Sequence, residues 1–243
     1  MDELWIPLRR YTDSMNTTYP LAAVGELIGE PARATILVSL LDGRARTAGE
    51  LAFIANISAQ SASAHLSKLV DGGLLFVRSS GRHRFYDLAG PEVAHTLEAL
   101  GAISTRPRTP DARRSLPGEE MYAARSCYDH LAGRVAVELA HCLEERKIIR
   151  PQGECDYELG SRGRDWFPRF GIDLDQVRRS RRHFARKCID WTERRPHIAG
   201  ALGAALCSRL ISLGWIARRR NTRALRITHE GARQLRTRFG LTL

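Results

Sequence analysis

The sequence predicts a mainly α-helical protein with small β wings: an N-terminal winged helix-turn-helix, then a C-terminal domain of two winged-helix-like repeats. Three observations carry this prediction. Two short helical patterns flank a tight turn within residues 48–71, a strand–turn–strand pattern follows at 74–88, and similar residues recur in 127–172 and 188–241. With 43% hydrophobic residues among 243, the chain can bury cores of ordinary size.

The sequence divides into four segments. Residues 1–18 are a short leader, and residues 19–103 contain the winged helix-turn-helix, which we expect to bind DNA and to dimerise. Residues 104–118 contain three prolines and no apolar period, which is typical of a linker. Residues 119–243 form a second domain, in which we expect a sensor.

Two helices are expected before the helix-turn-helix. The first covers about residues 19–28 and ends at Gly29. Pro31 suits the first position of the next helix, because the N–H that proline lacks would be unpaired there. Helical spacing predicts that the second helix buries Ile36, Leu37, Leu40 and Leu41.

Capping residues predict the helix-turn-helix itself. Thr47 and Glu50 form a capping-box pattern that begins a helix over about residues 48–55. Ser58 caps a second helix over about residues 59–71, which a pair of glycines ends. Two short helices joined by a turn of three to four residues form a helix-turn-helix.

A β-hairpin and a final helix complete this domain. Residues 74–78 and 82–88 have strand character, and the turn between them contains serine and glycine. The tip of the hairpin is basic, as in the wing of a winged helix. Helical spacing resumes over residues 91–103.

The helix over residues 59–71 has an apolar side and a small, polar side. Gln and Ser side chains can hydrogen-bond to base edges or phosphates, and arginine is favoured in a narrow minor groove. The alternative interpretations are that the polar helix face is only solvated and that the exposed arginines of the hairpin serve solubility alone. The residues that we expect to contact duplex DNA are Gln60, Ser61, Ser63, Ala64, His65 and Lys68 on the helix, and Arg82, His83 and Arg84 on the hairpin.

The segments EPARATILVSLLDG, TAGELA, ISAQSASAHLSKLVDGGLL and GRHRFYDL resemble the ArsR/SmtB family of bacterial winged-helix regulators. The resemblance covers about 85 of the 243 residues. It implies a homodimer that represses a promoter until an effector binds, and it implies that residues 91–103 pack into the dimer interface.

The sequence departs from the family at its metal sites. Ala52 and Ile54 stand where the family has two cysteines in helix three. His95 and Glu98 supply the second half of the family's last-helix pattern, but no Asp-x-His precedes them. We therefore expect neither site, and interpret His95 as a polar surface or interface residue.

The internal repeat places similar groups in both copies, each of which we expect to contain a helix, a strand pair and a helix. Cysteine and histidine three residues apart would share a helix face, so Cys127 and His130 could bind one ion, and such ligands suit zinc and softer metals. The candidate effector residues are Cys127, Asp129, His130, Cys188, Asp190, Trp191 and His197, of which Cys127, His130 and Cys188 are candidate metal ligands.

Four roles for this second domain stay open. It could bind a metal or metalloid ion, sense oxidation through its thiols, or hold a small organic effector between the repeats, with Trp191 and Trp215 as walls. It could also be purely structural, since buried cysteine often behaves as a small apolar residue. No cofactor is certain from the sequence.

The cysteines and the net charge bear on the cellular compartment of the protein and on its binding partners. The five cysteines include no Cys-x-x-Cys pair, and there is no secretion signal or apolar run of membrane-spanning length, so we expect free thiols in the cytoplasm and no membrane partner. The net charge is +11, of which residues 1–118 contribute +1 and the remainder +10. This surplus suggests a polyanionic partner but lies away from the clearest DNA-binding motif.

The sequence also bears on two other function classes, enzymes and adaptors. The sequence has no phosphate loop, dinucleotide-binding glycine pattern, nucleophile elbow or His-Glu-x-x-His, so we expect no enzyme and no catalytic residues. A thiol-dependent enzyme is the alternative that the Cys/His sets leave open. An adaptor that uses the winged helix for protein contacts would present an apolar patch instead of a polar face.

Overall fold

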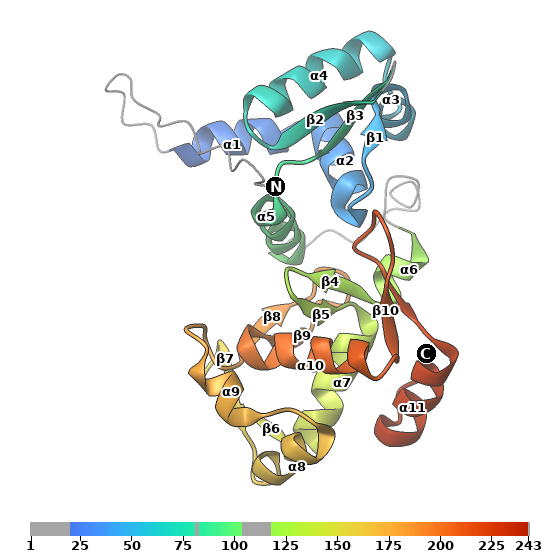
Figure 1. Cartoon of the computed structure of the whole chain (residues 1–243). Coiled ribbons are helices and arrows are strands. Elements are labelled where there is room, and N and C mark those ends of the chain that lie inside the picture. Colours follow the sequence, from blue (N-terminus) through green and yellow to red (C-terminus); the bar gives the residue numbers. More distant parts are fainter. Residues whose placement is uncertain (1–19, 81–82, 104–117, 243) are drawn as a thin grey trace, which may run out of the picture.

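The computed structural model describes residues 20–80, 83–103 and 118–242. The expected leader and nearly all of the expected linker lie outside these residues, as does Arg82. Figure 1 shows the helix-turn-helix at one end of the molecule and α8 at the other, with α5 between them. None of the described helices is both long and apolar enough to cross a membrane.

The first two helices form as their caps predict. α1 covers Pro20–Gly29 and α2 covers Pro31–Ser39, followed by the short 3-10 helix η1 over Leu40–Asp42. The Glu30 carboxylate accepts hydrogen bonds from the first free N–H groups of α2. The four predicted apolar residues of this segment are buried, namely Ile36, Leu37, Leu40 and Leu41.

The helix-turn-helix consists of α3, Ala48–Ala55, and α4, Ala59–Asp71. The capping box at the start of α3 is complete, and the Ser58 hydroxyl caps α4. Asn56 ends α3 in the left-handed conformation, with φ of 53°, which asparagine tolerates better than most residues. Local sequence signals therefore determine both helices.

The wing, which we define as the hairpin of β2 and β3, follows α4. β2 covers Leu75–Ser80, β3 covers His83–Leu88, and α5 covers Pro91–Ile103. A third strand, β1 over Arg46–Thr47, pairs with β3 and was not expected from the sequence. The core beneath these elements includes Ile36, Leu37, Leu51, Leu66, Leu69 and Leu75.

The second part begins at α6, Glu119–Ala123, and then repeats one order of elements: hairpin, helix, hairpin, helix. The first copy consists of β4 Arg125–Cys127, β5 His130–Ala132, α7 Arg134–Glu145, β6 Ile149–Gln152, β7 Asp156–Leu159 and α8 Gly163–Phe170. α9, Leu174–Arg179, joins the copies. The second copy consists of β8 Arg186–Ile189, β9 Pro196–Ala199, α10 Gly200–Ser212, β10 Ile216–Arg218, β11 Leu225–Ile227 and α11 His229–Phe239.

The opening hairpin of each copy corrects the expected order of helix, strand pair and helix. Cys127 and His130 do not share a helix face; they lie opposite each other on β4 and β5. The turn between them depends on Tyr128, whose φ is 59°. Glycine is required where each hairpin turns into its helix: Gly133 and Gly200 have φ of 87° and 78°, and a Cβ would lie within 3.0 Å of a carbonyl oxygen.

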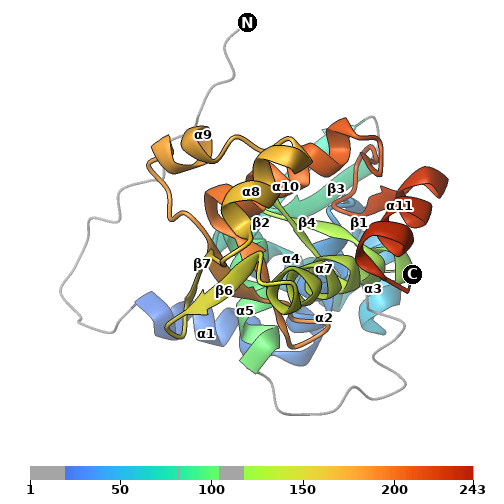
Figure 2. The same cartoon turned by 90° about the horizontal axis from the view of Figure 1, so that it is seen from below.

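The two copies share one hydrophobic core. It includes Val135 and Leu143 from α7 together with Leu202 and Leu210 from α10. Strands of both copies form a single sheet in the order β6-β7-β8-β9. Figure 2 shows α11 beside α7, where the Cys142 thiol donates a hydrogen bond to the carbonyl of Phe239 over 3.2 Å.

The loop between β10 and β11 contacts the first part of the chain. The backbone N–H of Arg223 donates to the Asp42 carbonyl over 2.7 Å, and its guanidinium donates to Glu98 on α5 over 2.8 Å. Leu41, Ala94 and Trp191 form a small apolar cluster beside this contact. The winged helix is therefore joined to the second part through both polar and apolar contacts.

Candidate functional site

The outer face of α4 is polar and free of bulky side chains. Ala62, Leu66 and Leu69 are buried against the core and hold the helix in place. The outer face, which we call the reading face, is exposed and consists of Gln60, Ser61, Ser63, Ala64, Ser67 and Lys68. Its side chains can donate and accept hydrogen bonds at base edges and phosphates.

His65 differs from the other predicted contacts on α4. Its side chain is partly buried and lies toward α2, with Nδ1 3.6 Å from a Glu30 carboxylate oxygen and 3.4 Å from Nη1 of Arg33. The Arg33 guanidinium also donates to the carbonyls of Glu26 and Leu27 at the end of α1. His65 thus joins α4 to the end of α1 and the start of α2.

The wing carries the remaining predicted contacts. His83 and Arg84 are exposed at the start of β3, close to the tip. Arg82 lies outside the described residues. Arg78 on β2 is exposed as well, but it lies 3.7 Å from the carboxylate of Asp87, which partly offsets its charge.

The opening hairpins of the second part bring four metal-binding side chains together. Cys127 lies opposite His130 on β4 and β5, and Cys188 lies opposite His197 on β8 and β9. One donor atom from each residue lies within 4.8 Å of the other three. We call these four residues the cysteine–histidine cluster. The candidate ligands Cys127, His130 and Cys188 thus meet, and His197, named from the sequence only as an effector residue, joins them.

The two imidazole rings of the cluster face each other. Nε2 of His130 lies 3.2 Å from Nε2 of His197, both rings are buried, and they stack with centroids 5.1 Å apart. Their Nδ1 atoms point toward carboxylates, at 3.6 Å from Asp129 and 3.9 Å from Asp190. Within the described residues, neither Nδ1 makes a hydrogen bond.

The two predicted aspartates lie behind the histidines, outside the donor set. Asp129 is half-buried and pairs with Arg182. Asp190 is fully buried and accepts hydrogen bonds from Arg125 over 2.8 Å and from the N–H of Gly133 over 2.7 Å. Burial would raise the pKa of Asp190, but the Arg125 guanidinium and these hydrogen bonds hold it well below its usual range.

α5 of the first part contacts the cluster through Cys127. The Cys127 thiol donates to a Glu98 carboxylate oxygen over 3.5 Å and lies 4.0 Å from Nδ1 of His95. Glu98 is buried and also accepts the hydrogen bond from Arg223. Interaction with the Cys127 thiol raises the pKa of His95, more than burial lowers it. His95 is exposed on α5 and lines the cavity beside Cys127.

No sequence signal could have found this contact. Glu98 and Cys127 are separated by 29 residues, and they fit no spacing of a known metal motif. The sequence did single out His95 and Glu98 as half of a family pattern, but it placed their partners on the same helix instead of on β4.

A cavity of about 910 Å³ opens beside the cluster. Its walls come from both parts of the chain: α5, the hairpins of the cluster, and the basic segment of Arg182, Arg186 and Lys187. Trp191, named from the sequence as a candidate effector residue, also lines it, and the Arg125 guanidinium lies 5.4 Å from its ring centroid. This cavity gives the cluster access to a ligand. Trp215, the other proposed wall, instead lies in the core.

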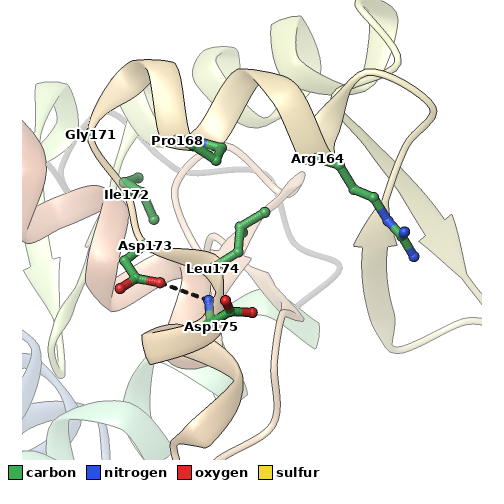
Figure 3. A pocket seen from close by; sticks show the side chains of 7 residues that line it. All are labelled: Arg164, Pro168, Gly171, Ile172, Asp173, Leu174 and Asp175. Carbon is green, nitrogen blue, oxygen red and sulfur yellow. Dashed lines mark hydrogen bonds between the residues drawn. The ribbon is translucent and has the colours of Figure 1, made fainter.

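A second hollow, of about 510 Å³, lies between α8 and α9. Figure 3 shows that its carboxylate Asp173 is already used as a helix cap, accepting a hydrogen bond from the N–H of Asp175 over 2.9 Å. Its other lining residues include Arg164, Pro168 and Ile172, with no cysteine or histidine. The cavity beside the cluster is the better candidate for a ligand.

Comparison with known proteins supports the interpretation of the first part as a winged helix-turn-helix. The sequence model described as the MarR family, not ArsR/SmtB, matches residues 30–84. The chain is 44% identical over 211 residues to the "Uncharacterized HTH-type transcriptional regulator YdfF" of Bacillus subtilis, covering 87% of this chain and 93% of YdfF. It is 38% identical over 83 residues to the HTH-type transcriptional regulator CmtR of Mycobacterium tuberculosis, covering 34% and 67%.

Two of the similar solved structures each cover about a third of this chain. HlyU from Vibrio cholerae is 26% identical, with 36% of this chain and 94% of HlyU covered at a TM-score of 0.33. A Mycobacterium bovis fragment described as a homodimeric winged helix-turn-helix DNA-binding domain is 28% identical, with 35% and 77% covered and the same TM-score of 0.33. The match to YdfF, by contrast, spans both parts of the chain, and the chain therefore belongs to the winged helix-turn-helix family of DNA-binding transcriptional regulators.

Proposed function

We propose that this regulator is a homodimeric repressor that reads operator DNA through α4 and responds to an effector bound in residues 119–243. The reading face carries the DNA part of the proposal: an exposed polar stripe on the second helix of a helix-turn-helix, followed by a wing with exposed His83 and Arg84. Side chains on such a helix enter the major groove, while a basic wing meets phosphates or the minor groove.

We propose an ArsR/SmtB-like arrangement of the dimer, built on α1 and α5. Leu21 on α1 is 73% exposed, and Leu100 and Ile103 on α5 are 39% and 75% exposed. Large apolar side chains at such exposure indicate a surface that a partner covers. A two-fold axis at this surface would place two α4 helices on one side of the DNA.

The domain limits stay part of this proposal: a leader over residues 1–18, a DNA-binding and dimerisation domain over 19–103, a linker over 104–118 and a sensor domain beyond it. The single core of residues from both copies supports treating the repeats as one folding unit. The contact of Arg223 with Glu98 supports coupling between the two domains.

For the second part we propose a role in sensing an effector, and not a role as an enzyme or as a protein-binding adaptor. YdfF, which is similar to this chain over both parts, is described as a transcriptional regulator. An effector in the cavity can alter DNA binding only by favouring one arrangement of the two reading helices over another. The cavity suits that role because α5 forms one of its walls.

Selection from random duplex DNA tests the proposed DNA recognition. A dimer with two α4 helices should enrich an inverted repeat whose half-sites lie about one helical turn apart, or 10–10.5 base pairs. The matched control is a variant in which Gln60 and Lys68 are replaced by alanine. Equal enrichment by this variant, or no inverted repeat with the wild type, would contradict the proposal.

A further inference from the structure

We propose that Cys127, His130, Cys188 and His197 form a tetrahedral Cys2His2 site for a thiophilic divalent ion of the zinc type. The two copies of the repeat contribute equally, each supplying one cysteine and one histidine from neighbouring strands of its opening hairpin. All four donor atoms lie within 4.8 Å of one another, although no short motif in the sequence joins them.

The spacing of the donors fits a tetrahedral ion. A Zn–N bond of about 2.0 Å places two nitrogen ligands about 3.3 Å apart at tetrahedral angles. The observed separation between the two Nε2 atoms is 3.2 Å. Two thiolates and two imidazoles are the ligands that zinc and its softer relatives prefer over magnesium or calcium.

The orientation of the histidines suits two ligands of one cation. Each Nδ1 lies toward a carboxylate, at 3.6 Å from Asp129 and 3.9 Å from Asp190, while the two Nε2 atoms face each other. Without an ion these two atoms share a single hydrogen bond, whereas a cation beside them would be bound by both lone pairs. Carboxylates behind ligating histidines are also the usual way in which proteins orient imidazole toward a metal.

The thiols of the cluster differ from the buried thiols elsewhere in the second part. Cys142 and Cys207 lie in the hydrophobic core, and among the described residues neither belongs to a group of metal-ligating side chains. Cys127 and Cys188 instead lie beside each other and beside the two histidines. Metal would therefore select the cluster over the other cysteines.

Cys127 also links the site to the winged helix, and this step rests on the proposed DNA-binding function. Its thiol now donates a hydrogen bond to Glu98 on α5. Binding of a metal removes the thiol proton, so Cys127 can no longer donate to that carboxylate. This hydrogen bond between α5 and β4 is thereby lost, while the ion pair of Glu98 with Arg125 on β4 stays, and the ion shifts the balance between arrangements of the two parts.

Titration of the reduced full-length protein with Co(II) alone tests the site directly. We expect visible d–d bands of a tetrahedral ion and a thiolate charge-transfer band that saturate at one ion per chain and are displaced by Zn(II). Cys188→Ser should lose the charge-transfer intensity of one thiolate, whereas Cys155→Ser, an exposed cysteine outside the cluster, should match the wild type. Octahedral spectra, or equal spectra for both variants, would overturn the site.

A second variant guards against loss of folding. His197→Ala should keep its circular dichroism spectrum yet gain no thermal stability from Zn(II), while His141→Ala, an exposed control on α7, should gain as much as the wild type. If His197→Ala is stabilised equally, the site is wrong.

Operator titrations separate failure of regulation from failure of DNA binding. With Zn(II), the Kd of the wild type should change by 5–150-fold, the usual range of allosteric coupling. The pair His95→Ala and Glu98→Gln should keep the Co(II) spectrum but lose this change. A metal-bound protein whose Kd is unchanged overturns the coupling alone, whereas a protein that never binds operator overturns the proposed function and leaves the metal site standing.

Discussion

At the scale of single residues, Asp190 organises the second part. It is buried, pairs with the buried guanidinium of Arg125, and accepts hydrogen bonds from Gly133 and Thr192 on neighbouring segments. Removing one partner of a buried ion pair leaves the other uncompensated, which costs about 3–5 kcal/mol. The aspartate therefore contributes to folding, and its carboxylate lies 3.9 Å from Nδ1 of His197.

We predict that Asp190→Asn lowers the free energy of unfolding by about 3–5 kcal/mol at neutral pH. The pKa of Asp190 is lowered in the folded state, so its stabilising contribution is present above the ordinary aspartate value of about 3.9 and is lost as the pH falls below it. Urea unfolding of both proteins between pH 7 and pH 3 checks this expectation.

Two outcomes of that series are diagnostic. The difference between the wild type and Asp190→Asn should shrink as the medium becomes more acidic, whereas Asp175→Asn, an exposed aspartate on α9, should match the wild type at neutral pH. A pH-independent difference would mean that the carboxylate charge does not contribute.

Gln60 carries a prediction about base recognition. A glutamine on the reading face can form a bidentate pair with adenine, worth roughly 1–3 kcal/mol of discrimination. Gln60→Ala should therefore weaken binding to the operator while leaving binding to scrambled DNA near the wild-type value. Fluorescence titrations on both duplexes would detect the difference, and equal losses on both would show that Gln60 does not read bases.

At the scale of secondary-structure elements, local signals predicted the first part closely. The bounds expected for α3, α4 and α5 agree with the structure because caps and prolines mark their ends: Thr47 with Glu50, Ser58, and Pro91. β1 was missed because two residues hold no periodic pattern, and they form a strand only by pairing with β3.

Local sequence signals could not predict the opening hairpins of the repeats. The turn at Tyr128 has no glycine or proline, and its positive φ is maintained by pairing of β4 with β5. Cys127 and Cys188 each pair with a histidine across a hairpin. The repeat in the sequence matched the two sets of residues but did not show that strand pairing holds each set together. The sequence thus named the right residues but gave Cys127 and His130 the wrong geometry.

The wing carries a prediction at the scale of elements. Arg82→Ala combined with Arg84→Ala should weaken binding to operator and scrambled DNA alike. The lost charges are attracted by phosphates and by the negative potential of the minor groove, and they do not contact base edges. Each lost phosphate contact should reduce the slope of log K against log salt by about 0.9. Titrations at several salt concentrations measure this slope, and an unchanged slope would remove the wing from the interface.

At the scale of the whole molecule, the structure connects two surfaces that lie far apart in sequence. α5 contacts Cys127 and Arg223 through Glu98, and it carries exposed Leu100 and Ile103 on the surface that we assign to the dimer. The sequence could not place these contacts, because they depend on how two separately folded cores meet. A change at the cluster can therefore reach the proposed dimer interface through one helix.

The most direct test of the account is the affinity of the full-length protein for its selected operator compared with a scrambled duplex of equal length and composition. Specific regulators typically bind their site 10³–10⁷ times more tightly than other DNA at physiological salt. We predict a ratio of at least about 10³ for the wild type, with two chains bound per duplex. Equal Kd values on the two duplexes at physiological salt would contradict the assignment of α4 as a sequence-reading helix.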